Sequence, residues 1–157
     1  MFEQISTFFT IEMIYLWLNI VVVPFWIVLL FFPQSKVCSY FVTSIFPYII
    51  FGAIYIYLIY YFYISGFDFV DSFNLYLGLN ELFNLLSDES FLILFWIHFL
   101  AINLFCGSWI VRDGQKLLIS KNLIFFPLVI TYFIGPVGIF IYWILRIFFA
   151  KKISLYD

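Results

Sequence analysis

The residues best suited to chemistry lie in residues 96–114, where polar side chains interrupt a long apolar run. This segment holds the only histidine of the chain, His98. Histidine is the side chain that titrates nearest to neutral pH, so His98 is a candidate general acid or base. The alternative is structural: a neutral imidazole that forms a hydrogen bond with another helix. The same segment contains Asn103, which we expect to form a hydrogen bond between helices.

A carboxylate near the start of the chain is a further candidate. Glu12 lies near one end of the first apolar run. A carboxylate buried in a membrane is costly and is for that reason a candidate for function. At the end of a run, however, Glu12 can simply reach water. Arg112 and Asp113 stand where their apolar run stops, so we expect an interfacial anchor and a helix end there, with Gly114 as the C-terminal cap.

Other kinds of site lack their characteristic residues. The chain has one histidine and no carboxylate cluster around it, which disfavours a metal site. It contains no phosphate-binding loop, dinucleotide fingerprint, serine hydrolase elbow or zinc motif. Cys38 and Cys106 lie in or beside apolar runs, so we expect no disulfide framework. The net charge of −2 argues against a nucleic-acid partner.

The composition indicates that transmembrane helices must position these candidate residues. Hydrophobic residues make up 66% of the 157 residues and charged residues 10%, against about 45–50% and roughly 25% in a soluble domain. A core of this size cannot bury so much apolar surface, so lipid must surround most of it. Four apolar runs reach the length of about 20 residues that a transmembrane helix needs; they cover residues 11–32, 40–64, 91–111 and 123–149. The predicted fold is an all-α membrane protein, a single transmembrane domain over residues 1–157 with four transmembrane helices.

The connection between the second and third runs carries its own pattern. Leucine and phenylalanine recur at helical spacing from Leu75 to Leu86, with Asn80, Glu81 and Asn84 on the other side. This pattern predicts a short helix, either lying on the membrane surface or packed on the end of the bundle.

Prolines interrupt three of the four runs. Pro24, Pro47, Pro127 and Pro136 each remove a backbone hydrogen bond if they lie inside a helix. We expect the sequence Gly135-Pro136-Val137-Gly138 to kink the fourth span. The small residues then allow either close helix packing or a widened pocket that admits a ligand.

The arrangement of these residues resembles a known family. The shared features are Trp96, His98, Asn103-Leu104-Phe105, Gly107, Trp109 and Asp113-Gly114 in the third run, Pro24-Phe25-Trp26 and Pro33 near the first, and Pro127, Thr131 and the Gly135–Gly138 sequence in the fourth. In order and spacing they resemble the abscisic-acid-deficient-4-like membrane proteins over most of the chain, least so in residues 65–90. Relatives usually carry aspartate where this chain has Asn103 and often arginine where it has Ser108.

The resemblance implies a reaction and a set of residues for it. The plant member is needed to make neoxanthin from violaxanthin, an isomerisation that opens an epoxide and forms an allene without a cofactor. His98 with Asp113 or Glu12 would supply the acid and the base. The ligand-binding candidates are Trp96, Asn103, Trp109, Gly135, Pro136 and Gly138.

Two functions therefore remain open at this point. One is a small membrane enzyme that isomerises a carotenoid or related isoprenoid. The other is a non-catalytic membrane protein that binds pigment or lipid or supports the assembly of a membrane complex. A transporter is a weaker third reading, since 157 residues would have to oligomerise to enclose a path. In each case we expect a multi-pass protein of a bacterial inner membrane or a plastid membrane, in contact with lipid and open to homo-oligomerisation.

Overall fold

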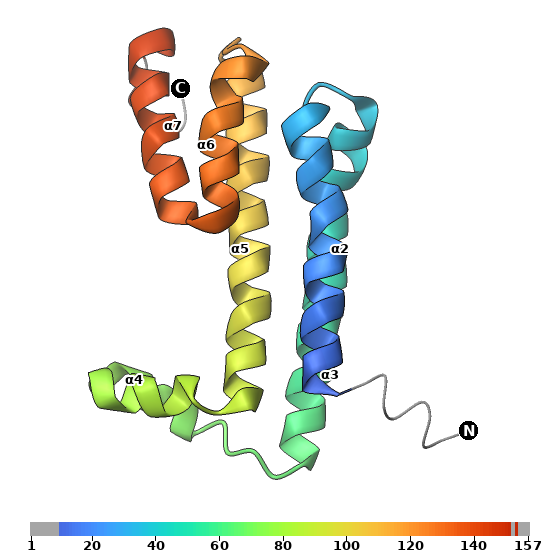
Figure 1. Cartoon of the computed structure of the whole chain (residues 1–157), viewed down its shortest axis with the longest axis vertical. Helices are drawn as coiled ribbons and strands as arrows, with labels where there is room; N and C mark the ends of the chain where they lie inside the picture. Colours follow the sequence, from blue (N-terminus) through green and yellow to red (C-terminus); the bar gives the residue numbers. More distant parts are fainter. Residues whose placement is uncertain (1–9, 152, 154–157) are drawn as a thin grey trace. The chain divides into compact units, whose positions relative to one another are not determined.

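All the helices and turns of the described residues connect without a β-strand among them. The computed structural model describes residues 10–151 and residue 153, and within them six α-helices follow one another (Figure 1). Their bounds are α2 (Ile11–Phe31), α3 (Phe46–Ile64), α4 (Leu79–Leu86), α5 (Glu89–Lys116), α6 (Lys121–Phe133) and α7 (Gly135–Ala150). A π-helical turn, Cys38–Val42, precedes α3, and a 3-10 turn, Asp71–Tyr76, precedes α4.

Three helical stretches are long and apolar enough to cross a membrane. They are Ile11–Phe31, Cys38–Ile64 and Glu89–Lys116, and they confirm the first three predicted spans. At most 39% of the residues in the most apolar window of each stretch are buried within the structure. The other residues of these windows are at least partly exposed, which suits contact with lipid.

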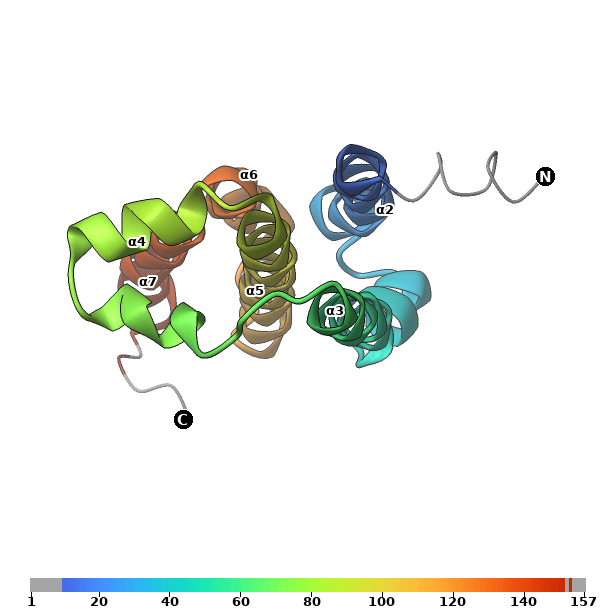
Figure 2. The same ribbon diagram turned by 90° about the horizontal axis from the view of Figure 1, so that it is seen from below.

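The predicted fourth transmembrane helix is wrong. Residues 121–150 form two helices, α6 and α7, which lie side by side as a hairpin in both views (Figures 1 and 2). Ile134 breaks the helix with a φ of −140° and a ψ of 83°. The cause is local, because Pro136 has no N–H, and a helix that ran through it would leave the carbonyl of Tyr132 without its hydrogen-bond partner. With 13 and 16 residues, the two helices rise about 20 and 24 Å, less than the roughly 30 Å of a bilayer core.

Two prolines begin helices where the sequence analysis expected them to interrupt spans. Pro47 is the second residue of α3 and Pro136 the second of α7. In the first turn of a helix the missing N–H of proline costs no hydrogen bond. Pro24 and Pro127 lie inside α2 and α6, as expected.

The end of α5 also differs from the prediction. The helix continues through Gly114 to Lys116 and closes by the bonds Leu118 N–H to the Gln115 carbonyl, 3.2 Å, and Ile119 N–H to the Gly114 carbonyl, 2.9 Å. This pair of bonds is a Schellman motif, with Leu118 in the left-handed conformation at φ 56°. Gly114 is instead a packing position, because a Cβ there would lie 3.1 Å from a methyl group of Ile124.

The predicted short helix before α5 is confirmed as α4, whose residues are all at least partly exposed. It runs across the axis of α5, as Figure 2 shows by presenting α5 end-on and α4 lengthwise. Such an orientation is the one a membrane-surface helix would take beside a transmembrane helix.

The contacts divide the chain into two compact units. Unit 1 contains the described residues up to Val21 together with Ile49–Phe99, and unit 2 contains Val22–Tyr48 and the residues from Leu100 onward. Leu18, Phe51 and Leu58 are core residues of unit 1. In unit 2, Gly107 leaves room for the ring of Trp26, since a Cβ at Gly107 would lie 2.7 Å from that ring.

Candidate functional site

A pocket in unit 1 combines apolar walls with two carboxylates. It has a volume of about 480 Å³ and lies between the first turns of α2 and of α5. Its lining comprises Ile11, Glu12, Tyr15, Glu89, Leu92, Ile93 and Trp96. A volume of this size is typical of small-molecule sites, which are mostly apolar with a few polar groups.

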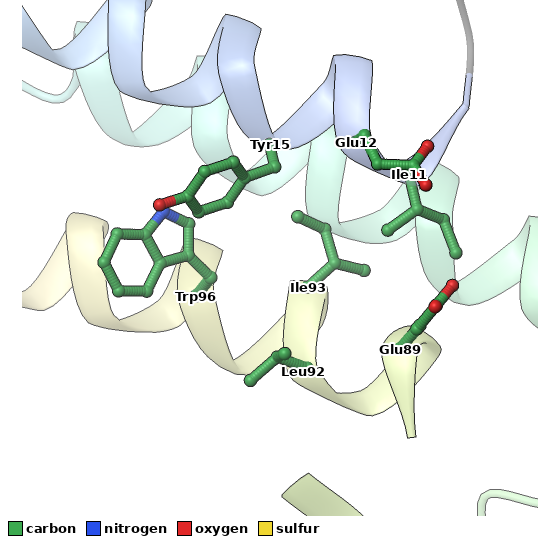
Figure 3. Close-up of a pocket in the computed structure, with 7 residues that line it drawn as sticks. All are labelled: Ile11, Glu12, Tyr15, Glu89, Leu92, Ile93 and Trp96. Carbon is green, nitrogen blue, oxygen red and sulfur yellow. The ribbon is translucent and has the colours of Figure 1, made fainter. Parts of the chain in front are cut away.

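The polar and aromatic groups occupy different ends of this pocket. Figure 3 shows the carboxylates of Glu12 and Glu89 near Ile11, and the rings of Tyr15 and Trp96 at the other end. The two ring centroids are 5.4 Å apart. The indole nitrogen of Trp96 is buried and has no hydrogen-bond partner among the described residues. An oxygen atom of a bound molecule would satisfy this donor.

The pocket contains two of the residues that the sequence singled out. Glu12 and Trp96 both line it. His98 does not line it and has an exposed side chain. Asp113 belongs to unit 2, and it lies on the same helix as His98, 15 residues further along. At 1.5 Å per residue this spacing corresponds to about 22 Å of helix, so the two side chains do not meet.

A second polar cluster lies buried in unit 2. The Tyr142 hydroxyl donates a hydrogen bond of 2.6 Å to Oδ2 of Asp113, and Nε of Arg146 lies 3.0 Å from the same oxygen. The approach of Arg146 is close enough for an ion pair but lacks hydrogen-bond geometry. The guanidinium carbon lies 5.1 Å from the ring centroid of Trp143, which adds a cation–π contact. Arg146 is fully buried, so Asp113 is the group that compensates its charge.

The remaining ligand-binding candidates surround the α6–α7 hairpin. Asn103, which is 4% exposed, lies against Gly135 at the hairpin turn, and its amide nitrogen has no partner among the described residues. Gly138 packs on the backbone of Thr131 in α6. Trp109 packs edge-on against Tyr142, with ring centroids 5.5 Å apart. Pro136 has an exposed side chain.

Sequence reasoning missed several residues of these clusters, among them Glu89, Tyr15 and Arg146. Glu89 was placed in the connection before the third span, and α5 begins two residues earlier than predicted. Tyr15 was one of 12 tyrosines, with nothing to distinguish it. Arg146 is the one charged residue in residues 123–149, and a charge inside so long an apolar run is a signal of burial that the sequence analysis did not use.

Comparison with known proteins places the chain in a family. The family profile described as ABA DEFICIENT 4-like matches residues 13–142. This range includes every residue that lines the pocket of unit 1 except Ile11 and Glu12. No curated protein and no solved structure gives a significant match. The match covers well over half of the chain and extends from α2 into α7. The chain therefore belongs to the ABA DEFICIENT 4-like family.

Proposed function

We propose that this chain is a multi-pass membrane protein that isomerises a carotenoid or related isoprenoid in the pocket of unit 1. The observation that supports this function is the presence of two carboxylates, Glu12 and Glu89, in one apolar pocket with aromatic residues at its other end. The membrane is that of a bacterium or a plastid. An apolar substrate would enter from lipid, and only its end ring would have to fit the pocket.

The chemistry requires one carboxylic acid and one carboxylate. The acid donates a proton to the epoxide oxygen as the carbon–oxygen bond breaks. The carboxylate takes a proton from the neighbouring carbon, and the electron pair of that carbon–hydrogen bond forms the new double bond of the allene. One proton is given and one is taken, so the product is an isomer and no oxidant or reductant is needed. Water at the pocket mouth returns the proton from one carboxyl group to the other.

The pocket favours Glu12 and Glu89 over the other candidates for these roles. His98 lies outside the lining of the pocket, and Asp113 is already bound to Tyr142 and Arg146 in unit 2. Trp96 offers its unpartnered indole N–H to a ring hydroxyl of the substrate. The rings of Tyr15 and Trp96 contact each other, with centroids 5.4 Å apart, and would pack beside the end ring of the substrate.

The test is pigment conversion in bacteria that accumulate violaxanthin. Wild type is expected to form an allenic product, and Glu12→Gln and Glu89→Gln are each expected to lower its rate of formation by about a hundredfold or more, the range of general acid–base catalysis. Glu81→Gln, on exposed α4 and outside the pocket, is the matched control and should retain full activity. Equal product from wild type and both pocket variants would contradict the assignment of the carboxylates.

A second function is favoured by one specific observation. Position 103 is an asparagine, whose buried amide nitrogen has no partner among the described residues, where relatives usually carry an acid. If the family's chemistry depends on that acid, this chain binds pigment or lipid without turnover. Purified protein that carries a polyene spectrum but forms no product would establish this alternative.

A further inference from the structure

We infer that the pocket of unit 1 opens at the membrane face that is turned away from the cytoplasm, and that it takes its ligand from the lipid leaflet of that face. The pocket lies at the starts of two helices, because Glu12 is the second residue of α2 and Glu89 the first of α5. The assignment of a side rests on the proposed function in one respect, that the chain crosses a membrane, and it requires no turnover.

Three membrane-length stretches determine the side on which each helix end lies. They are Ile11–Phe31, Cys38–Ile64 and Glu89–Lys116. When each stretch crosses the membrane once, the starts of the first and the third lie on the same side as the end of the second. The connection before Cys38 and the chain that follows Lys116 lie on the opposite side. The pocket agrees with this alternation, because its lining comes from the starts of the first and the third stretch.

The α6–α7 hairpin enters and leaves the membrane on the side where α5 ends. Its turn at Gly135 lies against Asn103, near the middle of α5. Helix α7 then returns toward the end of α5, where the Tyr142 hydroxyl donates a hydrogen bond of 2.6 Å to Oδ2 of Asp113. From Asn103 to Asp113, α5 rises about 15 Å, half of the roughly 30 Å of a bilayer core. The hairpin therefore reaches the middle of the membrane and does not cross it.

The turn of the hairpin is suited to a place inside the membrane. The N–H of Ile134 donates to the carbonyl of Ile130 over 2.7 Å. The carbonyl of Ile134 accepts from the N–H groups of Val137 and Gly138, each over 3.1 Å. A backbone surrounded by lipid must satisfy its own polar groups, and both groups of Ile134 are satisfied although the residue interrupts the helix.

The cations near the ends of the spans all belong to the side of the hairpin. In the described part of the chain these residues are Lys36, Arg112, Lys116, Lys121 and Lys151. Neither residues 10–32 nor residues 65–90 contain a lysine or an arginine. Lysine and arginine near span ends remain on the cytoplasmic side, and this rule counts the residues themselves, whether or not each has a partner. The end of α5 is therefore cytoplasmic, and the pocket at its start faces the other side.

The element before α5 adds an apolar surface on the same side as the pocket. Helix α4 ends at Leu86 and α5 begins at Glu89, so α4 lies at the membrane level of the pocket. Five large apolar side chains of the 3-10 turn and α4 are each at least 70% exposed: Phe73, Tyr76, Leu77, Leu79 and Phe83. Surface helices that bind anionic lipid are rich in lysine and arginine. Because residues 65–90 have acidic residues and no cation, the partner of this surface is a leaflet of neutral lipid.

The first test locates three positions of the full chain in bacterial cells whose outer membrane has been removed. Each of Asn80→Cys in α4, Asn122→Cys in α6 and Ile153→Cys after α7 replaces an exposed, uncharged residue, so the cations that set the orientation remain. A charged thiol reagent that does not cross membranes should label Asn80→Cys directly. The other two should be labelled only after the inner membrane is permeabilised. Wild type is the blank, since Cys38 is buried and Cys106 lies within a membrane-length helix.

Two outcomes of this labelling would overturn the inference. Direct labelling of Ile153→Cys without labelling of Asn122→Cys would show that residues 121–150 cross the membrane. Direct labelling of Asn122→Cys without labelling of Asn80→Cys would show the reverse orientation. Size-exclusion chromatography of each purified variant verifies that it is folded.

The second test addresses the pocket itself. Leu92 lines the pocket and is 46% exposed, so Leu92→Cys should be labelled by the same reagent without permeabilisation. Labelling of Leu92→Cys should stop its pigment conversion, whereas labelled Asn80→Cys, which lies outside the pocket, should keep its own rate. Labelling of Leu92→Cys only after permeabilisation would refute the assigned side. Labelling needs no turnover, so a chain that forms no product but is labelled as expected would contradict the isomerase function alone.

Discussion

Asp113 on α5 and Arg146 on α7 form a buried ion pair, with 3.0 Å between Oδ2 and Nε. Both side chains lie in unit 2, with exposed fractions of 7% and 0%. The pair connects the end of a membrane-length helix to the second helix of the α6–α7 hairpin. An uncompensated charge at either position would be costly, so the pair fixes how the hairpin packs on α5.

Asp113→Asn is expected to destabilise the protein by about 3–5 kcal/mol, because it leaves the Arg146 charge buried and unpaired. The amide oxygen can still accept the hydrogen bond of Tyr142, so the loss reports the charge and not the hydroxyl contact. The measurement is thermal unfolding in detergent, followed by circular dichroism. The double variant Asp113→Asn with Arg146→Met should regain part of the loss. If the double variant loses the sum of the two single losses, the two residues are not coupled.

Helices α3 and α5 end with the same pattern of backbone hydrogen bonds, but substitutions at their left-handed residues should change the stability of the fold in opposite directions. Helix α3 closes at Gly66, φ 88°, and α5 closes at Leu118, φ 56°. Leu118 is 91% exposed, so Leu118→Gly loses little packing and removes the strain of a left-handed leucine. We expect it to stabilise the fold by about 0.5 kcal/mol and Gly66→Ala to destabilise it by about 1 kcal/mol. Unfolding temperatures that shift in the same direction for both variants would contradict this account.

Gly135→Ala and Gly138→Ala should both destabilise the hairpin, but only the first should be rescued. A Cβ at Gly135 would collide with the Asn103 side chain, whereas one at Gly138 would lie 2.5 Å from the backbone nitrogen of Thr131. Adding Asn103→Ala should therefore restore much of the stability that Gly135→Ala loses. Adding Asn103→Ala to Gly138→Ala should not restore stability, because the new Cβ meets the backbone of Thr131, which no substitution at position 103 removes. Thermal unfolding of the four variants measures this, and rescue of both glycine variants would refute the distinction.

His98→Ala is expected to leave the rate of pigment conversion unchanged, because His98 does not line the pocket of unit 1. The measurement is the initial rate of product formation in membranes, with Glu12→Gln and Glu89→Gln measured beside it. A loss of rate in His98→Ala as large as in the two glutamate variants would return the histidine to the reaction.

The sequence by itself determined the helical class, three of the spans and two of the pocket residues. In lipid the backbone N–H and C=O groups must form hydrogen bonds with each other, because no water is available to them. An apolar run of about 20 residues therefore usually forms a transmembrane helix. The runs that became Ile11–Phe31, Cys38–Ile64 and Glu89–Lys116 could be recognised for this reason. Glu12 stood out as a carboxylate at one end of an apolar run, and Trp96 became a candidate through the resemblance to the family.

Only the tertiary structure decided which residues meet. A Gly-Pro pair inside an apolar run is compatible with a kinked span and with a hairpin, and contacts of Gly138 with Thr131 and of Gly135 with Asn103 distinguish them. The partners Glu12 and Glu89, like Asp113 and Arg146, come from different helices. Hydrophobic periodicity indicates which face of a helix is buried. It does not indicate which other helix packs on that face, because many different helices could bury the same apolar area.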